Sequence, residues 1–391
     1  MMAKTILFFD HTGRLGGGEI ALLNLVAALD INRFTPVVVL GEDGSLGDRL
    51  RKAGVETVIM PLDPRVGETR KEALGISAVM QLRKLYILLC YAWKLSRFIK
   101  RRKVVLLHTN SLKADIIGSI SAKLSRVPVI WHVRDRIDVD YLPPAAVNVF
   151  RWLCRILPDF VIANSAATLS TLPAQPHNRQ RVVHDGVAPM TTAKISESAQ
   201  SSRIVGLVGR ISPWKGQHIF VQAAHHIRQH FPKARFAIIG SALFGEDAYE
   251  YEVRVLVKKL GMENEMEFLG FREDVQMEIQ KLEILVHAST IAEPFGQVVA
   301  EAMIQGKPVV ATNGGGVAEI MQHNRTGLLV PMGDARKMTE AILWLLNNPE
   351  KGREMGRAGS ERIRKHFSIE QVARKVEHIY EELLESATSH E

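Results

Sequence analysis

Two glutamates, Glu293 and Glu301, stand eight positions apart in a stretch that the sequence predicts as a loop followed by a short helix. Pro294 and Gly296 exclude a helix upstream, so Glu293 lies on a loop, while residues 297–305 are expected to be helical. Carboxylates placed in this way can accept hydrogen bonds from the hydroxyl groups of a ligand.

The start of this predicted helix adds an anion site. The N–H groups of Phe295, Gly296 and Gln297 would point out of its positive end, where anions bind readily. A glutamate beside an anion site makes sense if the ligand carries both an anion and hydroxyls, as a sugar phosphate does. The alternative interpretation is an acidic residue that favours the helix end, plus one solvated glutamate.

Two further loops join a predicted strand to a predicted helix. The loop around Gly16 and Gly17, in GRLGGGE, lacks side chains that would keep a phosphate or a sugar at a distance. Its spacing is not that of a dinucleotide fingerprint, and a plain tight turn is the alternative. In GRISPWKG, Arg210 and Lys215 can converge on one site, and two cations suit a diphosphate; surface charges are the alternative.

A histidine and an aspartate follow another apolar run, in the segment WHVRD. His132 can bond a sugar hydroxyl or a developing charge, and Asp135 is expected to orient this histidine or to accept a proton. A structural histidine is the alternative. Residues 108–111 (HTNS) and 164–165 (NS) stand at equivalent strand ends and are candidates for lining the same cleft.

Metal and covalent chemistry find little support in the sequence. Asp138 and Asp140 form a short D-x-D pattern, which recurs easily by chance and is interpreted as a solvated turn. H-E-x-x-H, C-x-x-C and G-x-S-x-G motifs do not occur in the sequence.

Strand and helix patterns alternate along the whole chain, which predicts an α/β protein with two doubly wound parallel sheets. The polar segment 187–202 is predicted to be a linker between a domain over 1–186 and a second over 203–368, with a cleft between them. The last helix, 369–386 within the C-terminal segment 369–391, is expected to pack back on the first domain. The predicted strands are 5–9, 36–40, 56–60, 104–108, 127–132 and 160–163 before the linker, and 204–208, 235–239, 266–269, 284–286, 309–311 and 328–330 after it.

Composition supports this organisation. The chain has 391 residues, 43.6 kDa and 46% hydrophobic residues, enough for two ordinary domain cores. It holds two cysteines, Cys90 and Cys154, and its opening residues lead directly into an apolar strand. We therefore expect a protein of the reducing cytoplasm.

The net charge of +8 is concentrated in the first half of the chain. Segment 81–103 holds eight basic residues, no acidic residue and no apolar run long enough to span a membrane. One helical face is predicted to carry Leu85, Leu88, Leu89, Ala92, Leu95 and Ile99, with the basic side chains elsewhere. The segment is either a surface helix with a solvated basic face or a patch for an anionic membrane or lipid phosphate. No nucleic-acid motif accompanies the charge, and nucleic acid is not the expected partner.

Five motifs in order resemble glycosyltransferase family four, the large group of retaining, nucleotide-sugar-dependent enzymes with the GT-B fold. The motifs are GGGE at 16–19, VGRISPWKG at 208–216, FLGFRED at 268–274, EPFGQVVAEAMIQGKPVVAT at 293–312 and GGGVAEI at 314–320. The resemblance spans nearly the whole chain and is strongest after residue 203. It implies two Rossmann-like domains that face each other across a cleft.

The resemblance also implies roles for single residues. Glu293 would bind donor-sugar hydroxyls, Glu301 the ribose, and His132 the region of the sugar's 6-position. The diphosphate would be held by Arg210 and Lys215, with backbone N–H groups near Gly17 and at Phe295 and Gly296. The base would be read by the segment that contains Phe271, Arg272 and Asp274. Such enzymes need no metal. Many relatives have Asn-Gly-Val where this chain has Asp185-Gly186-Val187, which is a departure from the pattern.

Together these features predict a retaining hexosyltransferase for cell-surface or exopolysaccharide synthesis, acting on a glycan or a lipid-linked acceptor. UDP-glucose is the first choice of donor, with GDP-mannose and UDP-N-acetylglucosamine as alternatives. An epimerase of nucleotide sugars on the same fold, and a non-enzymatic basic binding protein, are the other functions considered. The oligomeric state is not predicted.

Overall fold

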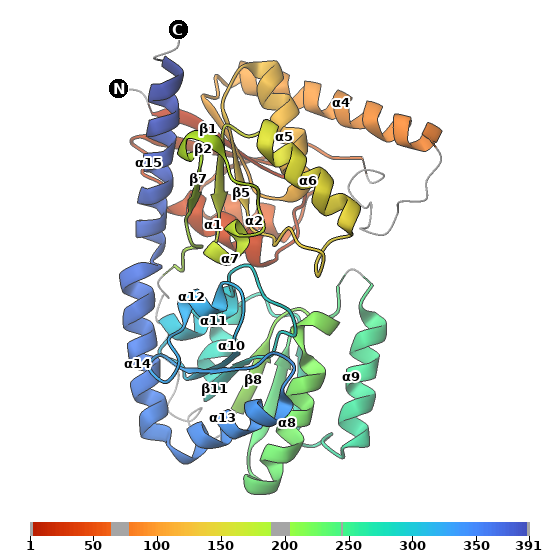
Figure 1. Ribbon diagram of the computed structural model, residues 1–391, viewed down its shortest axis with the longest axis vertical. Helices are drawn as coiled ribbons and strands as arrows, with labels where there is room; N and C mark the ends of the chain where they lie inside the picture. Colours follow the sequence, from red (N-terminus) through yellow and green to blue (C-terminus); the bar gives the residue numbers. More distant parts are fainter. Residues whose placement is uncertain (1–2, 64–77, 189–203, 244, 389–391) are drawn as a thin grey trace. The chain divides into compact units, whose positions relative to one another are not determined.

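Short apolar runs that end in glycine or polar residues form parallel strands in both halves of the chain. The structure is a computed structural model that describes residues 3–63, 78–188, 204–243 and 245–388 (Figure 1). It divides into unit 1, Met1–Gly186 with Ile369–Glu391, and unit 2, Val187–Ser368. Each unit is built on one parallel sheet, so the predicted α/β fold with two Rossmann-like units is confirmed. Most of the predicted linker, 187–202, lies outside the described residues.

Unit 1 has a seven-stranded sheet in the order β3-β2-β1-β4-β5-β6-β7. The order reverses between β1 and β4, and at such a switch point the loops after the strands diverge and leave room for a ligand. The strands are β1 Lys4–Asp10, β2 Phe34–Leu40, β3 Glu56–Ile59, β4 Leu106–Thr109, β5 Val129–Val133, β6 Phe160–Ala163 and β7 Gln180–Val182.

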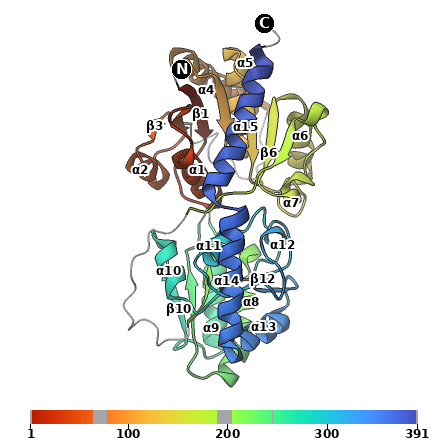
Figure 2. The same ribbon diagram turned by 90° about the vertical axis from the view of Figure 1, so that its left-hand side faces the viewer.

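Helices cover both faces of this sheet. The connections run in opposite directions on either side of β1, and right-handed crossovers then place α4, α5 and α6 on one face and α1 and α2 on the other. The C-terminal helix α15 packs beside α1 in this unit (Figure 2). The helices are α1 Gly17–Ala28, α2 Ser45–Lys52, α4 Ala78–Arg101, α5 Leu112–Ser125, α6 Pro144–Ile156, α7 Ala166–Leu169 and α15 Ile369–Thr388.

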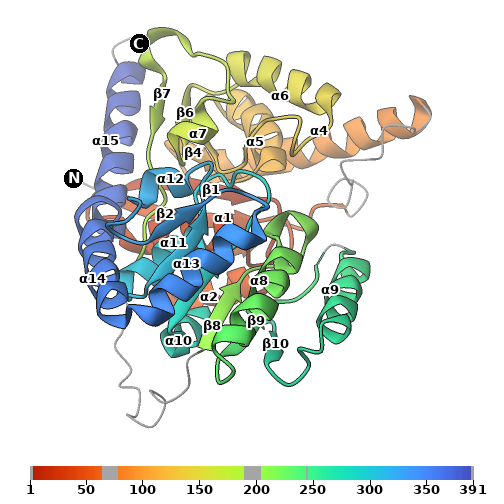
Figure 3. The ribbon, with the colours of Figure 1, turned by 60° about the horizontal axis from the view of Figure 1, so that its bottom comes forward.

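Unit 2 has a six-stranded sheet in the order β10-β9-β8-β11-β12-β13, with its switch point between β8 and β11. One core cluster joins the sheet to α8, α9 and α13, and a second joins it to α10, α11 and α12; α8 and α13 lie side by side (Figure 3). The strands are β8 Ile204–Val208, β9 Arg235–Ile239, β10 Met266–Gly270, β11 Ile284–His287, β12 Val309–Thr312 and β13 Leu328–Val330. The helices are α8 Gln217–His230, α9 Asp247–Lys259, α10 Val275–Lys281, α11 Gln297–Ile304, α12 Val317–Ile320, α13 Ala335–Asn347 and α14 Pro349–His366.

Each of the twelve predicted strands overlaps an observed strand, with boundaries that differ by at most two residues. The strand β7 was not predicted, because its three residues, Gln180 to Val182, are too short and too polar to show an apolar run. It is the edge strand beside β6, where half-buried residues are sufficient.

Candidate functional site

The Glu293 carboxylate is buried on the loop between β11 and α11, and three donors converge on one of its oxygens. Oε1 accepts hydrogen bonds from Lys215 Nζ at 2.6 Å, from His287 Nε2 at 2.9 Å and from the Ser289 hydroxyl. Thr312 Oγ1 lies 3.1 Å from Nδ1 of the same histidine and holds its ring from the other side. Among the described residues, no bond goes to Oε2, which keeps its lone pairs for a ligand.

The charge of Glu293 is fixed by these neighbours. Burial alone would raise the pKa of this carboxyl, but the charges and hydrogen bonds of Lys215 and His287 outweigh burial and hold the pKa well below its ordinary value. Glu293 is therefore a carboxylate at neutral pH and accepts hydrogen bonds, as a ligand rich in hydroxyls requires.

Lys215 is brought to Glu293 by a short turn after β8, η3, Pro213–Lys215. Gly216 follows at φ +70, and a Cβ at this position would lie 2.0 Å from a backbone oxygen of the next loop, so that only glycine fits. The turn is tied to that loop by the bond from Thr290 N to Trp214 O, 2.8 Å long. The indole of Trp214 carries both cations, with Lys215 Nζ 4.5 Å and Arg210 Cζ 5.5 Å from the ring centre. Both predicted cations therefore lie at the same indole ring.

The predicted helix after Glu293 is α11, which begins one residue beyond Gly296 at φ +99. The first amide that donates back into the helix is that of Val299, so the helix opens with its N-terminal amide groups directed outward. Phe295 is buried beneath this start. Gly315 supports the loop from below, because a Cβ there would lie 2.0 Å from the Glu293 carbonyl oxygen.

Glu301 is buried one turn further along α11. Its Oε1 accepts from Gln297 Nε2 at 3.1 Å. Gln297 Oε1 is buried and has no hydrogen-bond partner in the described chain, so it can accept a hydrogen bond from a ligand. Gln297 and Glu301, both predicted site residues, therefore lie one turn apart on α11 and are hydrogen-bonded to each other.

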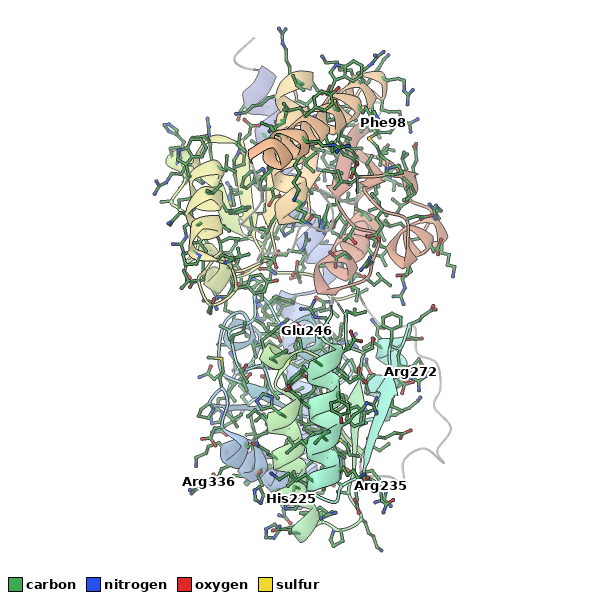
Figure 4. The ribbon with its side chains drawn as sticks, turned by 90° about the vertical axis from the view of Figure 1, so that its right-hand side faces the viewer. Phe98, His225, Arg235, Glu246, Arg272 and Arg336 are labelled. Carbon is green, nitrogen blue, oxygen red and sulfur yellow. The ribbon has the colours of Figure 1, made fainter. Side chains whose placement is uncertain are left out.

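The three residues predicted to read the base follow β10. Phe271 is 52% exposed, and Arg272 extends from this edge of unit 2 with its Nε 3.9 Å from the Glu278 carboxylate (Figure 4). Asp274 caps α10 by accepting from the Met277 amide at 3.2 Å, a local role that needs no ligand.

In unit 1, His132 is buried near the carboxyl end of β5. Its Nδ1 lies 3.0 Å from His108 Nε2, and its Nε2 has no hydrogen-bond partner among the described residues. Burial, reinforced by the charge of Arg134, holds the pKa of both histidines well below the ordinary value, so both rings are neutral. The expectation that Asp135 orients His132 is wrong. His108 occupies the Nδ1 side, and Asp135 accepts instead from the Tyr141 hydroxyl at 2.9 Å.

Arg134 explains the departure at Asp185. Its Nε donates to Asp185 Oδ1 at 2.9 Å, and Asn164 Nδ2 donates to Asp185 Oδ2, also at 2.9 Å. Arg134 also donates to the Asn110 side chain. An aspartate here thus receives a buried counter-charge, and the predicted strand-end residues 110 and 164 serve this network.

The glycine loop at Gly16 and Gly17 leads into α1, with the amide of Ile20 as the first to donate back, at 3.0 Å. Burial and the charge of Asp10 raise the pKa of Glu19 to about 8, so this carboxyl carries a proton at neutral pH. Asp138 and Asp140, in contrast, pair with Arg136 at 3.2 and 2.8 Å on the surface.

The predicted basic segment 81–103 lies largely on α4, which packs against α5. In its C-terminal half, Leu95, Phe98 and Ile99 belong to the core of unit 1, and Phe98 is labelled in Figure 4. Of the predicted apolar face, the N-terminal half is not covered, since Leu85 is 51% and Leu89 is 46% exposed. No helix in the described parts of the chain is long and apolar enough to span a bilayer.

Comparison with known proteins assigns both units. Residues 191–362 match the family model of glycosyl transferases group 1, and residues 16–186 match that of the glycosyl transferase 4-like domain. The chain is 29% identical over 170 residues to trehalose synthase of Pyrococcus horikoshii, covering 42% of this chain and 40% of that protein. It is 31% identical over 165 residues to N-acetyl-alpha-D-glucosaminyl L-malate synthase of Bacillus anthracis, covering 42% and 43%. These alignments span less than half of each curated relative.

A solved structure matches over the whole length. The crystal structure of Anabaena HepE in complex with UDP-glucose has a TM-score of 0.84 and 25% identity, covering 97% of this chain and 99% of that one.

His287, Ser289, Thr312 and Asp185 were not among the predicted site residues. Their common signal is a polar residue at or just after the carboxyl end of an apolar strand, or in a strand-end loop.

Proposed function

The chain belongs to the GT-B glycosyltransferases of family four, and from this premise we propose that it transfers a hexose from a nucleotide sugar to a hydroxyl group. The proposed donor is UDP-glucose, which the Anabaena neighbour holds; GDP-mannose and UDP-N-acetylglucosamine are the alternatives. The proposed acceptor is a glycan or a lipid-linked sugar of the cell surface. The observation that carries the proposal is the buried Glu293 carboxylate, locked in its charged form beside two cations and a helix start.

The two cations suit the leaving group. An ammonium has three hydrogens. Lys215 donates one of them to Glu293, so two remain for the oxygens of a diphosphate. Arg210 lies over the same Trp214 ring, with its Cζ 5.5 Å from the ring centre, and adds a second fixed charge. With the outward amides of α11, these groups can stabilise the negative charge that grows on the diphosphate as the anomeric bond breaks. We propose that this charge is balanced without a metal.

A retaining, front-face transfer follows from the same arrangement. The buried Glu293 is held by three donors on one oxygen, so its role is to bind sugar hydroxyls through the other rather than to attack the sugar. The departing phosphate then takes the proton of the acceptor hydroxyl. Glu301 is proposed to bind the ribose. Glu293→Gln should therefore lower turnover, whereas Glu301→Gln should mainly weaken nucleotide binding.

Proton NMR of the enzyme with UDP-glucose and no acceptor tests this. A retaining transferase slowly hydrolyses the donor with water as acceptor and releases UDP and α-glucose before mutarotation. Early β-glucose would contradict retention. Conversion to another hexose nucleotide without release of UDP would favour the epimerase.

A surface on unit 1 favours an acceptor held at a membrane. Helices α4, α5 and α6 carry ten Lys and Arg residues and one acidic residue, Asp115, which is buried. Large apolar side chains stand exposed on the same helices: Leu85, Tyr86, Leu89 and Trp93 on α4, and Val149, Trp152 and Ile156 on α6. Exposed aromatic residues within a basic surface suit the interface of an anionic bilayer.

Flotation with phosphatidylglycerol vesicles tests this surface. Each basic residue near an anionic membrane contributes about 1 kcal/mol, so Lys94→Glu with Arg97→Glu should weaken binding about thirtyfold or more at low salt. The matched control reverses Lys258 and Lys259 on α9, a helix whose basic residues are mixed with Asp247, Glu250 and Glu252. Binding that is absent at low salt, or that both double variants weaken equally, would refute the membrane contact.

A further inference from the structure

A chain of three buried side chains connects the C-terminal helix of unit 1 to His132. The Tyr380 hydroxyl on α15 lies 2.7 Å from His108 Nδ1, and His108 Nε2 lies 3.0 Å from His132 Nδ1. All three side chains are at most 1% exposed. The sequence pattern does not indicate this contact, because Tyr380 and His108 are 272 positions apart.

The hydrogens of this chain can be assigned by counting. Among the described residues, the Tyr380 hydroxyl has His108 Nδ1 as its hydrogen-bond partner, and the Tyr380 ring packs against the Phe34 ring in a T-shaped contact. Burial raises the pKa of Tyr380 well above its ordinary value, so the phenol keeps its hydrogen. That hydrogen must go to His108 Nδ1, because otherwise it would remain buried without an acceptor.

The rest of the assignment follows from histidine chemistry. A neutral imidazole that accepts at Nδ1 carries its hydrogen on Nε2, so His108 donates to Nδ1 of His132. The second ring is then in the same state, with its hydrogen on Nε2. That nitrogen is the buried atom of His132 that has no partner within the described chain.

We propose that Tyr380 and His108 are positioning residues that fix His132 as a hydrogen-bond donor through Nε2. This deepens the proposed function, on which it rests. His132 then binds an oxygen lone pair of the substrate, such as that of a sugar hydroxyl. It does not act as the base for the acceptor, because its only accepting nitrogen is occupied by His108.

The test is Tyr380→Phe, which removes one hydroxyl and leaves the ring. Its matched control is Tyr91→Phe on α4, which removes another buried tyrosine hydroxyl of the same unit, bonded to the Met60 carbonyl at 2.7 Å. Nitrogen-15 NMR of the histidine rings, without substrate, reports which nitrogen carries the hydrogen. The expected result is Nε2–H on both His108 and His132 in the wild type and in Tyr91→Phe, with mixed tautomers in Tyr380→Phe.

Kinetics give the second readout. For the hydrolysis of UDP-glucose with water as acceptor, kcat/KM should fall about fivefold in Tyr380→Phe, which is the effect of one weakened neutral hydrogen bond. In the control, kcat/KM should stay near the wild-type value. A hydrogen on Nδ1 of His132 in the wild type would overturn the proposal, as would equal kcat/KM in the two variants. Because the NMR experiment needs no turnover, it stands even if the proposed transfer is wrong.

Discussion

Replacing Lys215 by methionine should destabilise unit 2 far more than the loss of an ordinary ion pair. The Lys215 and Glu293 side chains are only 15% and 7% exposed, so the variant leaves a buried carboxylate without its cation. Breaking a buried pair in this way costs about 3–5 kcal/mol, and we take the lower end of this range because His287 and Ser289 still bond the same oxygen. For a unit of this size that corresponds to a fall in Tm of about 6–12 °C.

The double variant Lys215→Met with Glu293→Gln separates charge from packing. Glutamine removes the unpaired charge, so the double variant should recover about 2 kcal/mol and melt well above the single one. The control is Lys337→Met, which breaks the exposed 2.7 Å pair with Glu340 and should change Tm by about 1–3 °C at most. Differential scanning calorimetry measures all three. A single variant as stable as the control, or a double variant no more stable than the single one, would refute the reasoning.

Two further predictions follow from the site. His108 and His132 have a lowered pKa in the folded state, so the unfolded chain binds more protons below about pH 6.5, and the free energy of unfolding should decrease by up to about 1.4 kcal/mol for each ring and each unit by which the pH falls. Urea midpoints at pH 7.5 and 5.5 should therefore differ less in His132→Asn than in the wild type. An unchanged difference would contradict a buried neutral ring. Gly315→Ala should weaken UDP-glucose binding at least about tenfold, because its Cβ would displace the Glu293 loop, whereas Gly333→Ala, also at positive φ (+75) but with no atom within 4 Å, should not; equal titrations of the two variants would contradict the packing argument.

The alternation of apolar runs and helical periods was sufficient to predict both sheets, because strands buried on both faces show continuous runs of Val, Ile, Leu and Phe. It was also sufficient to place Glu293 on a loop, since proline and glycine act locally. It could not find β7, whose edge position needs no apolar run, nor the exposed half of α4. Periodicity showed that Leu85 and Leu89 share a face with Leu95, but which part of that face is covered depends on the length of α5 beneath it.

Site partners were harder to predict than the residues at the centre of the site. Lys215 and Glu293 were both found, but the bond between them, and those from His287 and Ser289, depend on how two loops meet at one sheet edge. The misassigned partner of His132 has the same origin. Asp135 is near in sequence, while His108 is brought close by the pairing of β4 with β5, which periodicity does not specify.

Calorimetric titration of UDP-glucose, UDP, GDP and ADP is the most direct test of the central claim, that unit 2 binds a nucleoside diphosphate sugar at the Lys215–Glu293 pair. The account predicts saturable binding of UDP-glucose and UDP, weakened at least about tenfold by Arg210→Met through loss of a charge-assisted bond. Binding should remain unchanged in Lys337→Met. If none of the four nucleotides binds at millimolar concentration, or if Arg210→Met binds UDP as the wild type does, the claim is contradicted.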